Sequence, residues 1–351
     1  MGAGCRQLPM FKYVSWHFCQ LSPLASLDLL LSVTFSPRVV YDAVSWRTAG
    51  KMRQVVQGIM LLLVPVAIVV FVRYYLSVYA HEVHEVQQNV HELTYEVQQL
   101  EKEQAMPVLV LKRYRNSICY IVGVYQVGFS GRAPTVHAHV SGTGFVVADG
   151  LVVTNRHVAE PWYKAPVDTA LLRKGAKPNL EKLVAFFPGM PEAVNISQAV
   201  LSAQGDLAVL RIQDSDAVHQ LRPVPLAHST PKPGELVVVV GYPMGVFGMV
   251  EKSPPAVYER LVLRRDDQVA PELAALSLIR PSATCGHLGD VVGEKLVYDA
   301  PTAPGASGGP VFNSGGEVIG VNAAYMDGYA GGTLGVSVHA LLPLISIAGT
   351  R

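Results

Sequence analysis

A serine at position 307 is surrounded by small residues in the stretch PGASGGP, residues 304–310. Glycines at this density let a backbone bend sharply, and they leave N–H groups free to bind a developing negative charge. A serine hydroxyl is a poor nucleophile by itself and needs a base that removes its proton. The stretch therefore indicates nucleophilic catalysis, provided that a base and a group orienting that base lie elsewhere in the chain.

Two partners for this serine occur earlier in the chain, each at the end of an apolar stretch. His157 follows GTGFVVADGLVVTNR, which has the pattern of two strands joined by a turn, and Asp206 opens the apolar stretch DLAVLRI. In a triad of this order, the histidine takes the proton of the serine and the aspartate orients the histidine. Taken singly, each of the three has an ordinary structural explanation. Their order and their places at strand ends together predict a catalytic triad.

Another serine chemistry uses the same residue types in a different order. An α/β-hydrolase has its aspartate and histidine after the serine, where this chain has Asp327 and His339. That fold needs strands alternating with helices before Ser307, and more chain after it than this sequence contains. The sequence therefore disfavours an α/β-hydrolase.

The elements that must position the three residues are mostly strands. From Val108 onward the chain consists of short β-type stretches separated by Gly, Pro, Asn and Asp, among them ICYIVGVYQV, GTGFVVAD, GLVVTNRHV, DLAVLRI, GELVVVVGYP, KLVYDA, GGPVF and EVIGVNAAY. Helical patterning is confined to about residues 254–278 and the end of the chain, and the charged stretch 250–281 predicts a surface helix. The fold class is all-β, in one or two barrels or sandwiches.

Residues 108 to about 345 resemble a trypsin-like serine peptidase, and specifically the HtrA/DegP branch. The resemblance rests on TNRHV at 154–158, on DLAV at 206–209, and on the spaced motif that begins at Asp299 and ends in PGASGGP. Ala306 departs from the asparagine that the branch has at this position. The resemblance implies two antiparallel β-barrels, protein or peptide substrates, and no metal or cofactor. The branch usually continues into PDZ domains, which have no counterpart in this sequence.

The resemblance also assigns roles to individual residues. His157, Asp206 and Ser307 correspond to the catalytic triad, and the backbone N–H groups of Gly305 and Ser307 correspond to the oxyanion hole. Because serine chemistry proceeds through an acyl-enzyme, the implied reaction is hydrolysis of a peptide bond in two steps.

The same correspondence predicts the pocket for the substrate side chain before the cleaved bond. Pro301 takes the position at its base, and Asn322, Ala323 and Ala324 form one wall. No acidic residue is available there to receive arginine or lysine. We therefore expect cleavage after small or medium aliphatic side chains.

An apolar stretch before the β-rich region is long enough to cross a membrane. Residues 55–76 are interrupted only by Gln57 and Arg73, and about 20 apolar residues span a bilayer as a helix. Basic residues precede the stretch (Arg38, Arg47, Lys51, Arg53), which predicts a cytoplasmic N-terminus and export of the rest. Residues 52–76 are thus a predicted signal anchor. A signal peptide cleaved after Ala80 is the alternative. Translation starting at Met52 would make residues 1–51 an artefact.

A stalk follows the membrane segment. No glycine or proline occurs between Ser77 and Gln104, and two sets of apolar residues recur every seven positions: Leu76, Val83, Val90 and Val97, then Tyr79, Val86, Leu93 and Leu100. This pattern predicts a coiled coil over residues 77–106, with three strands favoured over two. A single amphipathic helix is the alternative. The histidines (His81, His84, His91) match no metal-binding motif. We expect the helix to end at Met106-Pro107.

These segments predict a membrane-anchored serine endopeptidase whose protease domain, residues 107–351, lies outside the cytoplasm. The resemblance implies the inner membrane with the protease on its periplasmic side, a role in protein quality control or regulated proteolysis, and assembly as a homo-oligomer, with trimers common in the branch. A chaperone or scaffold with a latent triad, or a membrane-bound esterase, are alternatives. The net charge of +1 gives no reason to expect a nucleic-acid partner. Cys119 and Cys285 could pair or remain thiols.

Overall fold

The computed structural model describes residues 46–148, 150–264, 266–325 and 332–350. They belong to two units, which divide between Gln87 and Gln88. In the first unit the described residues form the beginning of helix α1 (Trp46–Tyr114), and every side chain from Gly50 to Gln87 is exposed. Most of the N-terminal segment 1–51 lies outside the described residues, so the proposed start at Met52 stays a hypothesis.

Helix α1 continues past Pro107 and ends at Tyr114, so the predicted end at Met106-Pro107 is wrong. A proline inside a helix costs about 3 kcal/mol. The helix persists because Met106, Val110 and Tyr114, spaced four residues apart, are buried, and each buried side chain of this size stabilises by about 1.5–3 kcal/mol. The ring of Tyr114 stacks on that of Phe312, with centroids 5.5 Å apart. The last turns of α1 are therefore packed on the β-rich part of the chain.

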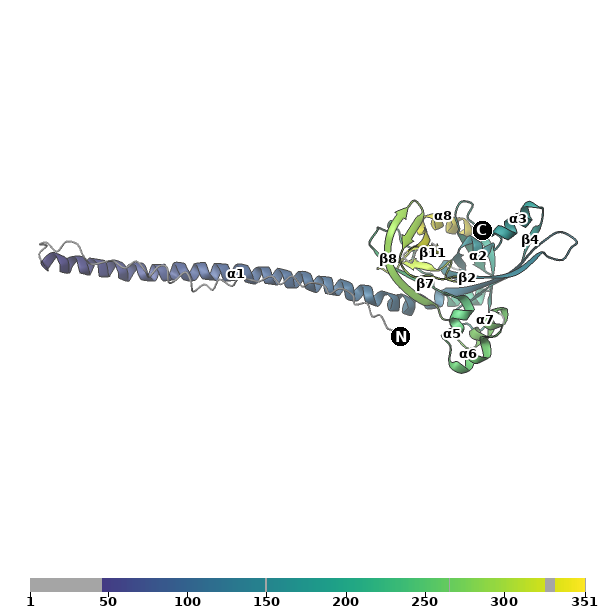
Figure 1. Ribbon diagram of the computed structural model, residues 1–351, viewed down its shortest axis with the longest axis horizontal. Helices are drawn as coiled ribbons and strands as arrows, with labels where there is room; N and C mark the ends of the chain where they lie inside the picture. The colour runs from purple at the N-terminus through teal and green to yellow at the C-terminus, as the bar shows by residue number, and fades with distance from the viewer. Residues whose placement is uncertain (1–45, 149, 265, 326–331, 351) are drawn as a thin grey trace, which may run out of the picture. The chain divides into compact units, whose positions relative to one another are not determined.

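Two closed antiparallel barrels of six strands follow the short 3₁₀ helix at Arg115–Ser117, which confirms the predicted all-β architecture (Figure 1). In the first barrel the strands are ordered β1-β2-β3-β6-β5-β4 and in the second β10-β11-β12-β9-β8-β7. The first barrel is built from β1 (Ile118–Gly128), β2 (Val136–Ala148), β3 (Leu151–Thr154), β4 (Lys177–Phe186), β5 (Val194–Leu201) and β6 (Ala208–Ile212). The second is built from β7 (Leu236–Gly241), β8 (Ser282–Val292), β9 (Lys295–Tyr298), β10 (Pro310–Phe312), β11 (Val318–Tyr325) and β12 (Thr333–Ser337).

Strand β1 of the first barrel is apolar on both faces because both faces are buried. Cys119 and Ile121 point into the barrel interior, whereas Ile118, Tyr120 and Val122 belong to a core between the two barrels. Side chains of a strand alternate between its faces, so a strand with two buried faces has a continuous apolar sequence. The same alternation holds along β7 of the second barrel.

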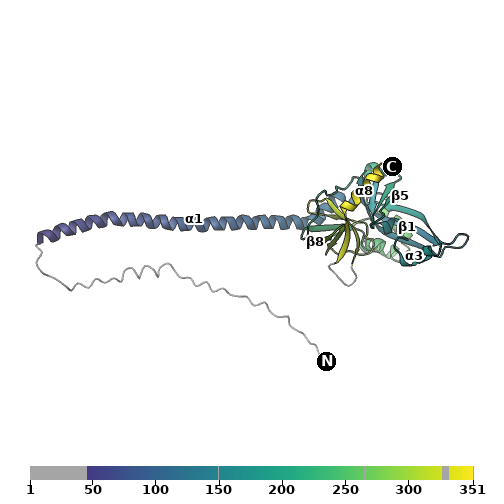
Figure 2. The same cartoon turned by 90° about the horizontal axis from the view of Figure 1, so that it is seen from above.

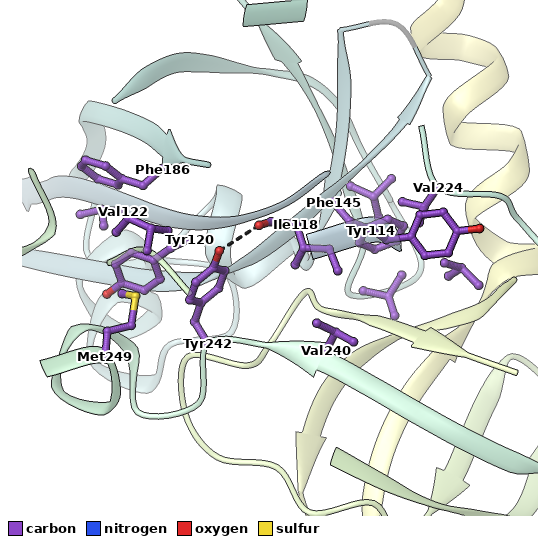
Figure 3. Close-up of a cluster of buried hydrophobic side chains, with 14 of the residues drawn as sticks. Tyr114, Ile118, Tyr120, Val122, Phe145, Phe186, Val224, Val240, Tyr242 and Met249 are labelled. Atoms are coloured by element: carbon purple, nitrogen blue, oxygen red, sulfur yellow. Dashed lines mark hydrogen bonds between the residues drawn. The ribbon is translucent and has the colours of Figure 1, made fainter. Parts of the chain in front are cut away.

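The core between the barrels includes the buried rings of Tyr120 and Tyr242 (Figure 3). The rings of Tyr120 and Tyr242 have centroids 5.5 Å apart, and the hydroxyl of Tyr242 donates to the carbonyl of Ile118 at 2.9 Å. Burial raises the pKa of Tyr242 well above its ordinary value. Because this hydrogen bond joins the end of β7 to the start of β1, it fixes one barrel against the other at the level of Tyr242.

Shorter helices occupy connections between strands, and one more, α8, follows the last strand. They are α2 (Arg156–Ala159), α3 (Pro166–Arg173), α4 (Ser215–Gln220), α5 (Gly245–Glu251), α6 (Pro255–Leu261), α7 (Asp266–Ala275) and α8 (Val338–Gly349). The single surface helix expected in the charged stretch is wrong, because two short helices, α6 and α7, form there directly after α5, and the three are grouped together in Figure 1. Buried Met249, Leu261 and Leu273 join them to the core between the barrels. Figure 2 shows the C-terminal helix α8 beside β5.

The two cysteines that follow the predicted membrane segment lie in different barrels. Cys119 on β1 is buried, Cys285 on β8 is exposed, and both are free thiols. Burial raises the pKa of the Cys119 thiol far above its ordinary value, so this thiol is unreactive. Of the two possibilities that the sequence leaves open, the structure shows unpaired cysteines.

Candidate active site

His157 lies in a short helix at the end of a buried strand of the first barrel. Strand β3 is buried along its whole length, and the chain turns at Asn155 into α2, a single helical turn that contains His157. The side chain of His157 stays 34% exposed. The buried strand therefore fixes the position of the turn, and the imidazole remains accessible to a ligand.

Asp206 accepts two hydrogen bonds from His157. Its Oδ2 lies 2.7 Å from Nδ1 of the imidazole, and its Oδ1 accepts the backbone N–H of His157 at 3.0 Å. The side-chain amide of Asn155 donates to the backbone carbonyl of Asp206 at 2.8 Å. Because an ionised carboxylate only accepts hydrogen bonds, the proton of a neutral His157 ring is placed on Nδ1, and Nε2 is left as the proton acceptor.

The charge of Asp206 is maintained by its neighbours. Burial by itself would raise the pKa of this carboxyl, but the hydrogen bonds and charge of His157, with a smaller contribution from Lys164, outweigh burial and hold the pKa below its ordinary value. Asp206 is therefore ionised at neutral pH. An ionised group in this position both orients the imidazole and stabilises its protonated form.

Ser307 lies in the loop that joins β9 to β10 of the second barrel. Gly305 and Gly308 have φ values of +93° and +88°, a region that side chains rarely adopt. The N–H of Gly308 donates to the carbonyl of Asn322 at 2.7 Å, and the N–H of Asn322 donates to the carbonyl of Gly309 at 2.8 Å. The glycines thus allow the bend around Ser307, and the bonds to β11 hold the bend in place.

The loop of Ser307 meets the first barrel next to His157. The carbonyl of Ser307 accepts the N–H of Thr143 on β2 at 2.8 Å. A Cβ atom on Gly142 would lie 2.6 Å from the side chain of Val158 and 3.1 Å from the carbonyl oxygen of Ser307. Residue 158 directly follows His157, so a glycine on β2 makes room for both segments. The structure brings the loop of Ser307 and the turn of His157 together at this point.

The hydroxyl of Ser307 is turned toward β11. Its Oγ donates a hydrogen bond to the carbonyl of Ala323 at 3.2 Å, and among the described residues it has no hydrogen bond to His157. The pair of His157 and Asp206 is thus assembled, whereas the serine hydroxyl rests on another acceptor. Catalytic hydrogen bonds in free enzymes are often formed only when a substrate is bound.

Two backbone N–H groups beside Ser307 are free to bind an anion. Within the described part of the chain, the N–H groups of Gly305 and Ser307 have no hydrogen-bond acceptor. The carbonyl of Pro304 accepts the N–H of Met244 at 2.7 Å. A trans peptide plane holds its C=O and its N–H on opposite sides, so this bond turns the N–H of Gly305 away from Met244.

A pocket of about 230 Å³ adjoins Ser307. The described residues that line it are Thr302, Ala303, Pro304, Ser307, Asn322, Ala323 and Ala324, and none of them is charged. They include Asn322, Ala323 and Ala324, the residues predicted to form one wall. Pro301, expected at the base, is not among these residues, and its carbonyl accepts the hydroxyl of Thr284 at 2.8 Å.

Asn322 is the buried polar residue of this pocket. It is 1% exposed, its Oδ1 accepts the hydroxyl of Tyr298 at 2.7 Å, and its Nδ2 donates to the carbonyl of Ala306 at 2.9 Å and to Thr302 Oγ1 at 3.1 Å. All hydrogen-bonding groups of the amide are thus satisfied within the protein. Asn322 forms a fixed wall of the pocket, and Thr302, which accepts one of its hydrogen bonds, also lines the pocket.

Three residues of the site were not identified from the sequence. Asn155 orients the backbone of Asp206, Thr302 lines the pocket, and Thr143 binds the loop of Ser307. The only available signals were local, because Asn155 lies two residues before His157 and Thr143 lies between two glycines of a strand. Neither position indicates which backbone group the side chain contacts.

Comparison with known proteins gives one family. Residues 142–321 match the model of the trypsin-like peptidase domain. A probable periplasmic serine endoprotease, DegP-like, from Pseudomonas fluorescens is 28% identical over 199 residues, which are 56% of this chain and 31% of the relative. The mitochondrial serine protease HTRA2 from Bos taurus is 29% identical over 215 residues, which are 61% of this chain and 37% of the relative.

The chain spans about a third of the length of these two relatives. Among solved structures, the serine endoprotease from Yersinia pestis is similar at 18% identity, with a TM-score of 0.43 and coverage of 68% of this chain and 65% of that chain.

Proposed function

Because the chain belongs to the family of trypsin-like peptidase domains, we propose that it is a serine endopeptidase that cleaves peptide bonds through Ser307, His157 and Asp206. The observation that carries the proposal is the 2.7 Å hydrogen bond between Nδ1 of His157 and the ionised Asp206. A base oriented in this way leaves Nε2 to take a proton from a serine. The proposal is tested by reaction with a fluorophosphonate, which modifies only an activated serine.

The reaction begins with a rotation of the Ser307 side chain from the carbonyl of Ala323 toward His157. His157 takes the hydroxyl proton as Oγ attacks the substrate carbonyl, and it then gives this proton to the leaving amine. Asp206 stabilises the imidazolium that forms between the two transfers. Water then attacks the acyl-enzyme, with the same proton transfers through His157, and this hydrolysis restores the free Ser307.

The oxyanion of the intermediate binds to the N–H groups of Gly305 and Ser307. Neither group has a protein acceptor among the described residues, and the bond from Met244 to Pro304 favours the orientation that this role requires. Loss of one such donor typically costs about 3 kcal/mol of transition-state stabilisation. This contribution explains why the loop needs glycine at a position with φ +93°.

The pocket beside Ser307 accepts the side chain before the cleaved bond. With no charged residue among those described and a volume of about 230 Å³, it favours small or medium uncharged side chains such as Ala and Val. We expect cleavage of a peptide library mainly after such residues. Thr302→Asp, which adds a carboxylate to the lining, is expected to shift cleavage toward Arg and Lys. Cleavage chiefly after Arg or Lys by the unaltered protein would contradict this assignment of the pocket.

A membrane anchor is the proposed role of the first half of α1. Of the described residues, one helix is long and apolar enough, by length and composition, to cross a membrane, and its apolar side chains over residues 52–76 are exposed. Basic residues before it favour a cytoplasmic N-terminus, which places the protease domain on the extracytoplasmic side of the inner membrane. Cleavage of exported or misfolded proteins, as quality control or regulated proteolysis, fits this location.

The second half of the exposed helix is proposed to hold several chains together. The apolar residues that recur every seven positions are 48–60% exposed from Val83 to Leu100. In a parallel coiled coil these side chains would be buried against a second or third copy. The absence of a buried asparagine in this seam favours a trimer.

This stalk is tested on the full chain in detergent by light scattering. Val90→Asp combined with Leu93→Asp adds charges to the seam and is expected to give monomers, whereas the unaltered chain is a trimer. The control, Gln98→Asp combined with Gln99→Asp, adds the same charges outside the seam and is expected to remain a trimer. A seam variant that stays trimeric would show that the barrels are sufficient for assembly.

A latent protease that acts as a chaperone or scaffold is the second candidate. The observation that favours it is the bond of Ser307 Oγ to Ala323 in place of His157. The two candidates differ in their reaction with a fluorophosphonate in the presence and absence of an unfolded protein. A peptidase is labelled in at least one condition, and a permanently latent triad is labelled in neither.

A further inference from the structure

A fully buried threonine of the first barrel contacts the loop of the proposed oxyanion hole. The hydroxyl of Thr143 on β2 donates to the carbonyl of Gly305 at 2.8 Å and accepts the backbone N–H of Tyr242 at 3.1 Å. We infer that Thr143 is a positioning residue that holds the Gly305 peptide in the orientation needed to bind the oxyanion. The inference rests on the proposed function as a serine endopeptidase.

Gly305 needs to be held from both sides. At φ +93° it has the conformational freedom of glycine, so its N–H direction is not fixed by its own backbone. The peptide plane before it is held by the bond from Met244 to the carbonyl of Pro304. The plane after it is held by Thr143 Oγ1. The N–H of Gly305 lies in the first of these planes, and fixing the second plane opposes the backbone rotation at Gly305 that would let the first plane turn.

The backbone of Thr143 contacts the same loop. Its N–H donates to the carbonyl of Ser307 at 2.8 Å, and its carbonyl accepts the hydroxyl of Thr154 at 2.7 Å. One residue therefore binds the carbonyls of both residues whose N–H groups form the proposed oxyanion hole. Thr143 belongs to the first barrel and the loop to the second, so the hydrogen bonds couple the site to the packing of the barrels.

The surroundings of Thr143 make room for its hydroxyl. A Cβ atom on Gly241 would lie 2.9 Å from Thr143 Oγ1 and 3.3 Å from the Cα of Ala306, so glycine is needed there for the approach. Tyr242 is anchored by its own hydroxyl bond to Ile118 in the core between the barrels (Figure 3). The donor that binds Thr143 Oγ1 is thus fixed by buried contacts, and it directs the hydroxyl proton toward Gly305.

Thr143→Val keeps the shape of the side chain and removes both hydrogen bonds. Because the oxyanion exists only in the transition state and the intermediate, the expected effect is a loss of kcat of about 10- to 100-fold with little change in KM. Thr143→Ser, which keeps the hydroxyl, is expected to restore most of the activity. A purely structural role would instead alter KM and stability together.

The test compares two inhibitors on the full chain in detergent: a tripeptide aldehyde and the matching alcohol, both with the sequence of the best cleaved library peptide. The aldehyde forms an oxyanion when Ser307 attacks it, whereas the alcohol binds without one. Thr143→Val is expected to weaken the aldehyde by about 10-fold or more and to leave the alcohol unchanged. The control Thr333→Val removes another buried hydroxyl bond, to the carbonyl of Ala300, and should leave the affinities for both inhibitors unchanged.

Unchanged aldehyde affinity in Thr143→Val, or equal loss for both inhibitors, overturns the inference while the proposed function stands. If Thr143→Val does not fold, Thr143→Cys, with a similar size and a weak donor, is measured with the same expectations. An unaltered protein that neither cleaves peptides nor binds the aldehyde more tightly than the alcohol overturns the proposed function, and this inference with it.

Discussion

Ser307→Ala is expected to lower kcat for peptide cleavage by about 10⁶-fold, because it removes the nucleophile that forms the acyl-enzyme. The hydroxyl makes one hydrogen bond, 3.2 Å long and to a backbone carbonyl, so its removal should change stability little. The measurement is kcat on the best library peptide together with the midpoint of thermal unfolding. The loss is expected to be no larger in the double variant that also carries His157→Ala, since triad members act as one unit.

The control for this substitution is Ser314→Ala, an exposed serine in the turn between β10 and β11. It should keep full activity. If Ser307→Ala retained more than about one hundredth of the activity of the unaltered protein, the nucleophile would have to be another residue.

Asp206→Asn is expected to lower kcat on the order of 10⁴-fold. Asparagine has the same shape, but it can donate a hydrogen bond to Nδ1 of His157. The ring proton is then held on Nε2, where the base must instead be free to accept a proton. The loss should appear in kcat more than in KM, because the imidazolium develops only in the transition state.

Asp214→Asn is the matched control for Asp206→Asn. Asp214 accepts the N–H groups of Asp216 and Ala217 at the start of α4, and asparagine caps helices equally well. Its activity should equal that of the unaltered protein. A loss below about tenfold in Asp206→Asn would mean that the 2.7 Å bond to His157 has no part in the chemistry.

The barrels could be predicted from the sequence because their signals are local. The apolar stretches ICYIVGVYQV and GELVVVVGYP became β1 and β7, each with one face in a barrel interior and the other between the barrels. His157 and Asp206 could be located because both stand directly beside such strands. Their pairing follows from the order of β3 and β6, which are neighbours in the first barrel.

Features that depend on distant contacts could not be predicted. A proline such as Pro107 ordinarily predicts the end of a helix. Here the burial of Met106, Val110 and Tyr114 against the barrels outweighs the free-energy cost of a proline inside the helix. The lining of the pocket by Thr302, and the turn of the Ser307 hydroxyl toward Ala323, depend on how the loop 299–309 crosses β11. Spacing along the chain carries no information on that crossing.

The burial of helices α5, α6 and α7 could not be predicted from the sequence for the same reason. Their charged sequence indicates a solvent-facing surface, and the apolar positions of α5, α6 and α7 are too few for a confident assignment of a buried face. Their burial arises from contacts with the core between the barrels, which contains residues from both ends of the protease domain.

Labelling of the full chain with a fluorophosphonate shows directly whether Ser307 is a nucleophile activated by His157. Mass spectrometry of the digested protein is expected to find the adduct on the peptide containing Ser307, in the presence or absence of an unfolded protein, and to find none in His157→Ala. A folded protein without an adduct in either condition, or with an adduct on another serine, would contradict the account.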